Sequence, residues 1–426
     1  FEFLPLEHVD ENTPRPHTYK GWRVQTAFQV DRAIYDKILL DHARDLGCEV
    51  REETKVASIE REEDRVTGLT LSDGSKVTAR YYIDASGNVG ILRRAMGVKV
   101  DAPTLLQNVA FWDYWENPRW EGEQSMAATR VHIRSLPYGW IWFIPLSPTR
   151  TSIGVVTPAT HYKKLGKRPA EMYEEALREE PFVAQLLDGA TSRNKVESTT
   201  DWSYVVDRTY GDNWFLVGEV AGFADPILAA GMTLTQTGAR ELAYTILELD
   251  RGDHNRQWLL ERYDDLQRRR VRQHMRFAEY WYSANGVFEN IRENCAAIAE
   301  DAGLKLNPAE AFRWLAQGGL GDDVPGQVGI GGLDVAGVKQ VMLRLTGDQA
   351  GWKINGKNVF KLNLQGAKKV TVGRPDGKGR IVVAEAYVRG PYKLELIGVQ
   401  QALFNALQKS SDIDKILDHM RNEFSL

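Results

Sequence analysis

Two tryptophans separated by one residue form the most distinctive chemical group of this sequence. Trp140 and Trp142 lie in the segment Gly-Trp-Ile-Trp-Phe-Ile-Pro, residues 139–145. On an extended strand the side-chain alternation would place Trp140, Trp142 and Ile144 on one face. Pro145 has no amide hydrogen for a sheet ladder, so it predicts the strand end. Such an apolar wall with two indole N–H groups could exclude water from a reactive planar cofactor. A plain core strand is the alternative reading.

A second informative segment covers residues 214–233. It begins with an apolar run that stops at Gly218, continues through an acidic turn and ends in small residues before a helical pattern. Amide N–H groups at Gly231 and Met232 would lie at the positive end of that helix, where an anion or an electron-rich cofactor edge is stabilised. The Asp225 carboxylate could accept a hydrogen bond from a cofactor hydroxyl. The alternative is a corner in which the small residues only relieve crowding.

A third segment could also hold a cofactor. The apolar run 77–83 leads into Asp84-Ala85-Ser86-Gly87, and residues 91–96 then have a helical pattern. A strand that ends in a glycine-containing turn before a helix is typical of the cofactor edge of an α/β sheet.

The elements that would position these residues can be read from periodicity. Asp31 can cap a helix that ends at Gly47, with an apolar stripe that includes Ile34 and Ile38. A tight turn at residues 72–74 predicts a meander within 56–83, and the dense aromatic pattern predicts antiparallel strands within 108–156. Further expected elements are helices over 169–187, 232–249 and 257–277, and a hairpin turn at 375–377.

Composition limits the classes of function. The chain has 426 residues, a net charge of −4 and two cysteines. This balance gives no general attraction to nucleic acid, and two cysteines exclude a disulfide scaffold and fit a reducing cytoplasm. We expect no metal site, because the histidines lack partners at ligand spacing. The sequence has no apolar stretch of 18 residues, so we expect no membrane-spanning helix.

Taken in this order, the Asp-Ala-Ser-Gly turn, the Trp-x-Trp-x-Ile-Pro strand and the segment from Gly218 to Gly231 resemble the flavin-dependent halogenases. These are FAD oxidoreductases of the p-hydroxybenzoate hydroxylase fold. The resemblance covers Phe1 to Leu249. It implies an α/β FAD-binding domain, an antiparallel-sheet substrate domain and a C-terminal helical and α+β extension. The expected boundaries are 1–107 with 206–250 for the FAD-binding domain, 108–205 for the substrate domain, 251–337 for a helical region and linker, and 338–426 for a small module.

The resemblance also implies a chemistry. Reduced FAD reacts with oxygen to a C4a-hydroperoxide, halide attacks it to give hypohalous acid, and a lysine passes the halogen to an electron-rich aromatic substrate. A separate flavin reductase would supply the reduced cofactor, and a homodimer is left open. Implied wall residues are Trp140, Trp142, Ile144 and Pro145; implied cofactor residues are Val56, Ser86, Gly87, Gly218, Asp225, Pro226, Gly231 and Met232; implied halide residues are Ala230 and Gly231.

Three departures from the family pattern limit the resemblance. No Gly-x-Gly-x-x-Gly opens the chain, the glycine cluster at 329–332 reads as linker, and the family lysine is expected upstream of Phe1 rather than at Lys20. The missing Gly-x-Gly-x-x-Gly motif and the missing lysine both predict a truncated N-terminus. Leu228 stands where tryptophan halogenases carry a glutamate base, which favours a phenol-like substrate. A reductase like the geranylgeranyl reductases or an aromatic monooxygenase on the same scaffold, and a non-catalytic or partial chain, remain the alternatives.

Overall fold

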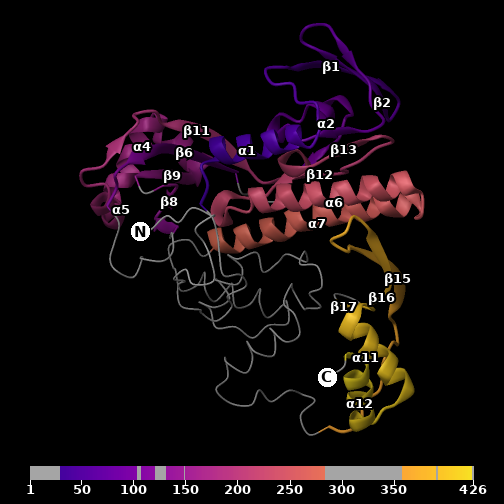
Figure 1. Cartoon of the computed structure of the whole chain (residues 1–426). Coiled ribbons are helices and arrows are strands. Elements are labelled where there is room, and N and C mark those ends of the chain that lie inside the picture. Colours follow the sequence, from indigo (N-terminus) through magenta and orange to yellow (C-terminus); the bar gives the residue numbers. More distant parts are fainter. Residues whose placement is uncertain are drawn as a thin grey trace.

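A computed structural model of the chain describes residues 29–102, 107–119, 131–147, 149–283, 357–389 and 392–424. Figure 1 shows helices and sheets arranged around two long helices, α6 (Gly231–Arg251) and α7 (Arg256–Ser283). Within the described ranges, no helix combines the length and the apolar character needed to cross a membrane. The expected domain boundaries stay a prediction.

The N-terminal part pairs one helix with a small meander. Helix α1 (Arg32–Asp45) begins as predicted, because the Asp31 carboxylate accepts a hydrogen bond from the Ala33 amide at 3.0 Å. The meander also forms as predicted, in the strand order β1-β2-β3. Its strands are β1 (Val56–Glu62), β2 (Arg65–Leu71) and β3 (Lys76–Val77).

A parallel pair of short strands forms the centre of the molecule. Strand β4 (Tyr82–Asp84) pairs with β13 (Trp214–Leu216), which follows it by about 130 residues in the sequence. Buried apolar residues of both strands pack with helix α2 (Ile91–Ala95). A second small sheet has the order β14-β12-β5, with β5 (Val100–Asp101), β12 (Tyr204–Val206) and β14 (Gly222–Phe223).

The predicted antiparallel sheet is present and six-stranded, in the order β10-β6-β9-β8-β7 with β11 also paired to β6. One of its faces packs on helices (Figure 1) and holds a large apolar cluster. The strands are β6 (Gln107–Glu116), β7 (His132–Leu136), β8 (Gly139–Pro145), β9 (Arg150–Pro158), β10 (Thr191–Ser192) and β11 (Glu197–Trp202). The helices are α3 (Ala159–Leu165), α4 (Pro169–Glu179) and α5 (Pro181–Leu186).

One expectation differs from the structure. The helix expected over 169–187 is broken at Glu180, whose backbone is extended because the following Pro181 disfavours the helical region. Its carboxylate then caps α5 through the Val183 amide at 2.7 Å. Among the antiparallel strands expected within 108–156, β7 begins at His132, and residues 120–130 lie outside the described part of the chain.

Helices α6 and α7 are joined by buried charges. The Glu241 carboxylate of α6 binds Arg262 of α7 at 2.8 Å and lies 3.6 Å from Arg270. Both Glu241 and Arg270 are almost fully buried. Tyr263 of α7 donates to the Leu216 carbonyl of β13 at 2.7 Å. These contacts hold α6 in place against the parallel strand pair.

The C-terminal module docks on the same helices. It contains β15 (Lys368–Pro375), β16 (Ile381–Arg389), β17 (Tyr392–Glu395), α11 (Gly398–Lys409) and α12 (Ile413–Phe424). The hairpin expected at 375–377 joins β15 to β16. The fully buried Glu248 of α6 accepts from the Ile381 amide at 3.1 Å and lies 3.3 Å from Arg380. The module therefore packs against α6 through a buried carboxylate.

Candidate active site

Strand β8 has the two faces that its sequence predicts. Ile141 and Phe143 are fully buried in the apolar cluster beneath α4 and α5. Trp140, Trp142 and Ile144 alternate with them and therefore lie on the opposite face. Strand β8 ends at Pro145, as expected from its missing amide hydrogen.

Strand register builds a row of side chains across the opposite face. Gly154 of β9 lies between Trp142 of β8 and Trp112 of β6, directly paired with both. A Cβ atom at Gly154 would overlap the Trp142 indole, so this indole lies directly over the glycine. The Trp112 ring of β6 contacts the Trp142 ring, with ring centroids 6.5 Å apart. Ser152 accepts a hydrogen bond from the Trp142 Nε1 at 3.1 Å.

We call the face formed by Trp112, Trp140, Trp142 and Gly154 the indole face. Trp140 lies 5.9 Å from Trp142 between ring centroids and is 1% exposed, whereas Trp142 is partly exposed. Tilted and offset aromatic pairs of this kind are favourable packing arrangements. The indole face is therefore a rigid apolar surface whose side chains have few alternative positions.

The parallel strand pair carries the second half of the candidate site. Its carboxyl ends lead directly into the turns at Ser86-Gly87 and at Gly218, and ligands of open α/β sheets bind at such ends. The buried Asp84 holds the first turn. Its carboxylate accepts from the Ser86 amide and hydroxyl at 2.9 and 2.6 Å and from the Leu92 amide at 2.8 Å.

Gly87 of the first turn and Gly231 at the start of α6 leave space beside the backbone, whereas a Cβ atom at Gly218 would lie 3.1 Å from the Thr235 side chain. A Cβ atom at Gly87 would meet only the Glu219 carboxylate, at 3.4 Å, and one at Gly231 would meet nothing within 4 Å. Gly218 has φ of 72°, a left-handed conformation that glycine adopts without strain. We call the region formed by Ser86, Gly87, Gly218 and the start of α6 the flavin edge, after the cofactor that the sequence predicts for it.

Helix α6 begins at Gly231 with Ala230 as its N-cap. The first ladder bond runs from the Leu234 amide to the Ala230 carbonyl, so the amides of Gly231 and Met232 precede it. Gly231 is exposed and Met232 partly exposed. A positive helix end with accessible amides is suited to an anion or an electron-rich edge.

Two contacts bring the indole face and the flavin edge to the same side of the sheet. Asn108 belongs to the same face of β6 as Trp112, and its amide donates to the Asp225 carboxylate at 3.2 Å. At the other end of the sheet, Arg150 pairs with Asp31 at 2.7 Å. The face that carries the indoles is therefore turned toward α1 and the turn before α6.

One carboxylate at the flavin edge has a perturbed protonation equilibrium. Burial raises the pKa of Glu219 above its usual value, and the charge of Arg32 opposes this only in part. The Tyr204 hydroxyl donates to the Glu219 carbonyl at 2.5 Å, and burial likewise raises the pKa of Tyr204. Burial therefore makes ionisation of both groups less favourable than in water.

The structure places most of the predicted site residues in these two regions. Trp140, Trp142 and Ile144 share one face of β8, and Pro145 ends that strand. Ser86, Gly87, Gly218, Asp225, Pro226 and Ala230 lie in the turns at or beside the flavin edge, and Gly231 and Met232 begin α6. Val56 lies elsewhere, at the start of β1 in the meander sheet. Lys20, the cluster at 329–332 and the side chain of Leu228 lie outside the described residues.

Sequence reasoning missed four residues: Asn108, Trp112, Ser152 and Gly154. The tryptophan content around residue 112 was a signal, but only the strand register pairs Trp112 with Gly154. Asn108 had no local signal, because its partner Asp225 is 117 residues away in sequence. Within the part of the chain that the structure describes, no group of three or more His, Cys, Asp or Glu could hold a metal ion.

Comparisons with known proteins match the chain to halogenases. The family model of tryptophan halogenases matches residues 9–290. The tryptophan 2-halogenase of Chondromyces crocatus is 31% identical over 251 residues, 55% of this chain and 46% of the relative. The flavin-dependent halogenase armH1 of Armillaria mellea is 32% identical over 249 residues, 53% of this chain and 48% of the relative. The chain thus spans about half the length of these curated relatives.

Solved structures show the same fold. The flavin-dependent halogenase CmlS superposes with a TM-score of 0.69 at 23% identity, covering 93% of this chain and 74% of that one. The myxobacterial chondrochloren halogenase CndH superposes with a TM-score of 0.56 at 24% identity, covering 72% and 77%. The FAD-dependent halogenase architecture is therefore shared, including the α/β character expected from the sequence.

Proposed function

The chain belongs to the tryptophan halogenase family, and we propose that its protein uses reduced FAD, oxygen and halide to halogenate an electron-rich, phenol-like aromatic molecule. The observation that carries the proposal is the indole face, fixed by Gly154 and turned toward the flavin edge. The activity, the substrate and the partners are proposed for the whole protein, because this chain spans about half the length of these relatives.

The residues of the flavin edge fit a flavin. Gly87 and Gly231 leave open space, and the start of α6 offers amide N–H groups to an electron-rich ring edge. We propose Ser86, Gly87, Gly218, Asp225, Pro226, Gly231 and Met232 as its contacts, with Val56 as an outlying one. When bound, reduced FAD supplies the reducing power and the oxygen activation that turn halide into an electrophilic halogen donor.

The start of α6 is also the proposed halide position. Ala229 has φ of 50° and turns the chain so that Ala230 and Gly231 precede the helical ladder. The methyl group of Ala230 and the missing side chain of Gly231 allow an anion to approach the backbone, and the positive helix end stabilises its charge. The family lysine that transfers the halogen is proposed to lie outside this chain.

The indole face is proposed to separate the two reactants. A dry apolar surface between the flavin edge and the substrate limits hydrolysis of reactive intermediates and direct oxygen transfer to the substrate. Trp142 serves this role because Gly154, Trp112 and Ser152 all limit its movement. Trp140, Ile144 and Pro145 extend the same strand.

The substrate class rests on residue 228 and on chemistry. Leucine cannot act as a base, and a phenol-like ring is electron-rich enough to lose its ring proton with less assistance. A separate flavin reductase is the proposed source of reduced FAD. The cytoplasm is the proposed compartment, on the basis of the low cysteine content.

A direct assay tests the activity. The purified protein is incubated with FAD, a flavin reductase system, oxygen, bromide and a panel of phenols, and products are identified by mass spectrometry. Brominated phenol is the expected product. Hydroxylated phenol or a reduced C=C bond without halogenation would assign a monooxygenase or a reductase instead. Absence of flavin absorbance from the protein would favour a non-catalytic role.

A matched pair of variants tests the wall. Trp142→Phe removes an indole on the indole face, whereas Trp115→Phe removes one on the opposite face, where its Nε1 bonds the Tyr173 hydroxyl at 2.9 Å. We expect only Trp142→Phe to raise the ratio of hydroxylated or uncoupled product to halogenated product. Equal ratios in both variants would show that Trp142 contributes packing alone.

A further inference from the structure

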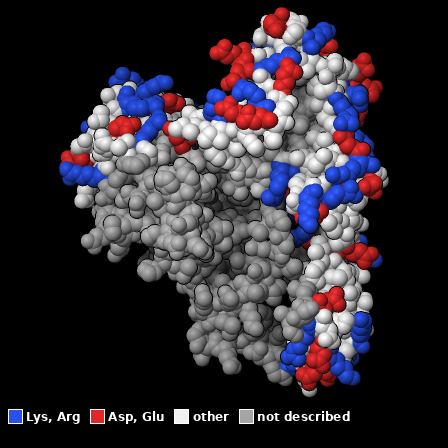
Figure 2. Space-filling view, in the orientation of Figure 1, with Lys and Arg blue, Asp and Glu red and all other residues white. Residues whose placement is uncertain are grey.

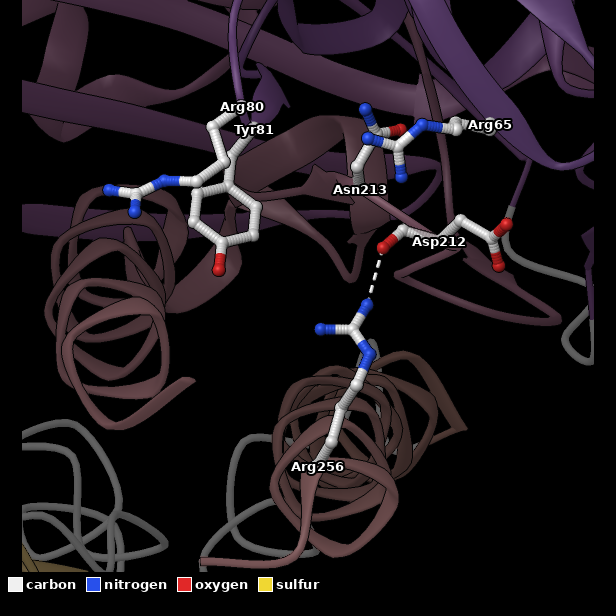
Figure 3. A pocket seen from close by; sticks show the side chains of 6 residues that line it. All are labelled: Arg65, Arg80, Tyr81, Asp212, Asn213 and Arg256. Carbon is white, nitrogen blue, oxygen red and sulfur yellow. Dashed lines mark hydrogen bonds between the residues drawn. The ribbon is translucent and has the colours of Figure 1, made fainter. Parts of the chain in front are cut away.

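A polar pocket lies on the other side of the parallel strand pair. Its volume is about 420 Å³, and its lining comprises Arg65, Arg80, Tyr81, Asp212, Asn213 and Arg256 (Figure 3). The six residues come from the start of β2, the two loops before β4 and β13, and the start of α7. Three guanidinium groups from three separate segments therefore meet around one space.

The position separates this pocket from the flavin edge. Tyr81 immediately precedes β4 and Asn213 immediately precedes β13, so the pocket lies at the amino ends of the parallel strands. The flavin edge lies at their carboxyl ends. Arg80 and Tyr81 also contact Asp250, near the far end of the 21-residue helix α6, which spans roughly 30 Å. A ligand in this pocket would therefore not occupy the flavin edge.

The charges of the pocket are only partly compensated. Arg80 pairs with Asp250 at 2.7 Å. Arg256 donates to the backbone carbonyl of Asp212, a neutral acceptor, and Figure 3 shows the Asp212 carboxylate directed away from that contact. Among the described residues, no carboxylate forms an ion pair with Arg65 or Arg256. Each of these two groups therefore has donors left for an anion.

Hydrogen bonds and ring packing fix the segments around the pocket. Asn213 is buried and exchanges two hydrogen bonds with Val66 of β2, both at 2.9 Å. The Tyr82 amide donates to the Asn213 carbonyl at 2.9 Å. The Tyr81 ring packs on the buried Phe215, with centroids 6.1 Å apart. These contacts hold the segments that carry Arg65 and Arg80 before any ligand arrives.

We propose that this pocket binds a small phosphate monoester. Guanidinium groups bind phosphate oxygens through paired charge-assisted hydrogen bonds, and two of them here lack a carboxylate partner. The volume exceeds that of a bare phosphate and leaves room for an organic group beside the Tyr81 ring. This site is independent of the halogenation proposed above, since its residues belong to the opposite end of the strands.

Calorimetric titration with phenyl phosphate tests the site, with FAD present at saturation so that the flavin edge is filled. We expect saturable binding that weakens as salt is raised. Arg256→Gln and Arg65→Gln should each weaken it about tenfold, equivalent to about 1.4 kcal/mol. Arg61→Gln is the matched control, because Arg61 is also exposed and also donates to a backbone carbonyl.

The arms of the titration distinguish the sources of binding. Inorganic phosphate alone should bind more weakly than phenyl phosphate, and benzoate, a single negative charge, more weakly still. Equal binding of phosphate and phenyl phosphate would restrict the site to a free oxyanion and overturn the ester assignment. Unchanged affinity in the double variant Arg65→Gln/Arg256→Gln, with an unchanged melting temperature, would overturn the site itself. So would the absence of binding to the unaltered protein.

Discussion

The indole face and the flavin edge are built in opposite ways. On the indole face, side chains complete one another: Trp142 covers Gly154, Trp112 closes the row and Trp140 is 1% exposed. At the flavin edge, backbone groups are held open by buried carboxylates such as Asp84, and Gly231 has nothing within 4 Å of a Cβ position. An apolar wall forms by packing, whereas a polar binding edge depends on amides that packing leaves accessible.

Helix α1 beside the flavin edge sharpens this contrast. Its predicted apolar stripe exists, but Ile34 is 63% and Ile38 is 59% exposed within the structure. Figure 2 shows Lys and Arg interspersed with Asp and Glu on the described surface, so neither sign of charge dominates that view. A helical period identifies which residues share a face; it does not identify what covers that face.

The largest expected effect comes from the support of the flavin edge. Glu241→Ala leaves Arg262 and Arg270 buried without their carboxylate, and the expected loss of unfolding free energy is about 3–5 kcal/mol. Urea denaturation measures it. Asp265→Ala is the control, since this exposed carboxylate lies 3.7 Å from Arg269 and its loss should change stability by less than about 1 kcal/mol. Equal losses would show that the buried pair does not anchor α6.

Gly154→Ala should disturb the indole face next. The new methyl group overlaps the Trp142 indole, and overpacking of this kind costs about 1–3 kcal/mol. A shifted tryptophan emission spectrum should accompany this loss, while flavin affinity stays the same. Gly68→Ala is the matched control, because its Cβ would meet only ordinary contacts from 3.4 Å in another sheet. An unshifted spectrum in Gly154→Ala would contradict the fixed position of Trp142.

Asp84→Ala should affect the flavin edge without reaching the indole face. Removal of this carboxylate leaves the Ser86 and Leu92 amides without their acceptor, and an unsatisfied buried donor costs about 1–3 kcal/mol. We expect weaker FAD binding, measured by flavin fluorescence quenching, with an unchanged tryptophan spectrum. A spectrum altered as strongly as in Gly154→Ala would show that the two regions are coupled.

The smallest expected effect is a pH dependence at Glu219. Burial raises its pKa in the folded protein above the usual 4.5, so the folded state holds the proton more tightly than the unfolded state. The stability of the unaltered protein should therefore fall as the pH rises from about 4.5 through the raised value. Glu219→Gln removes this fall, so its melting temperature should gain relative to the unaltered protein across that window. A constant difference at all pH values would contradict a buried, perturbed carboxylate.

Much of the architecture was predictable from local rules. Side-chain alternation assigned Trp140, Trp142 and Ile144 to one face, Pro145 marked the end of β8, and Asp31 marked the start of α1. Helix α6 and the turn before it also followed from a short apolar run, small residues and a helical period. These features depend on contacts within a few residues of one another, which a sequence displays directly.

The composition of the site was decided only by the tertiary structure. Gly154 seats Trp142 because the registers of β8 on β9 and of β9 on β6 coincide at one position. Asn108 meets Asp225 because a whole sheet and a distant turn pack on the same side. Sequence alone determined which residues share a face or end an element. Which faces meet depended on packing between separate elements, 117 residues apart for Asn108 and Asp225, because that packing is set by shape and burial and leaves no local period.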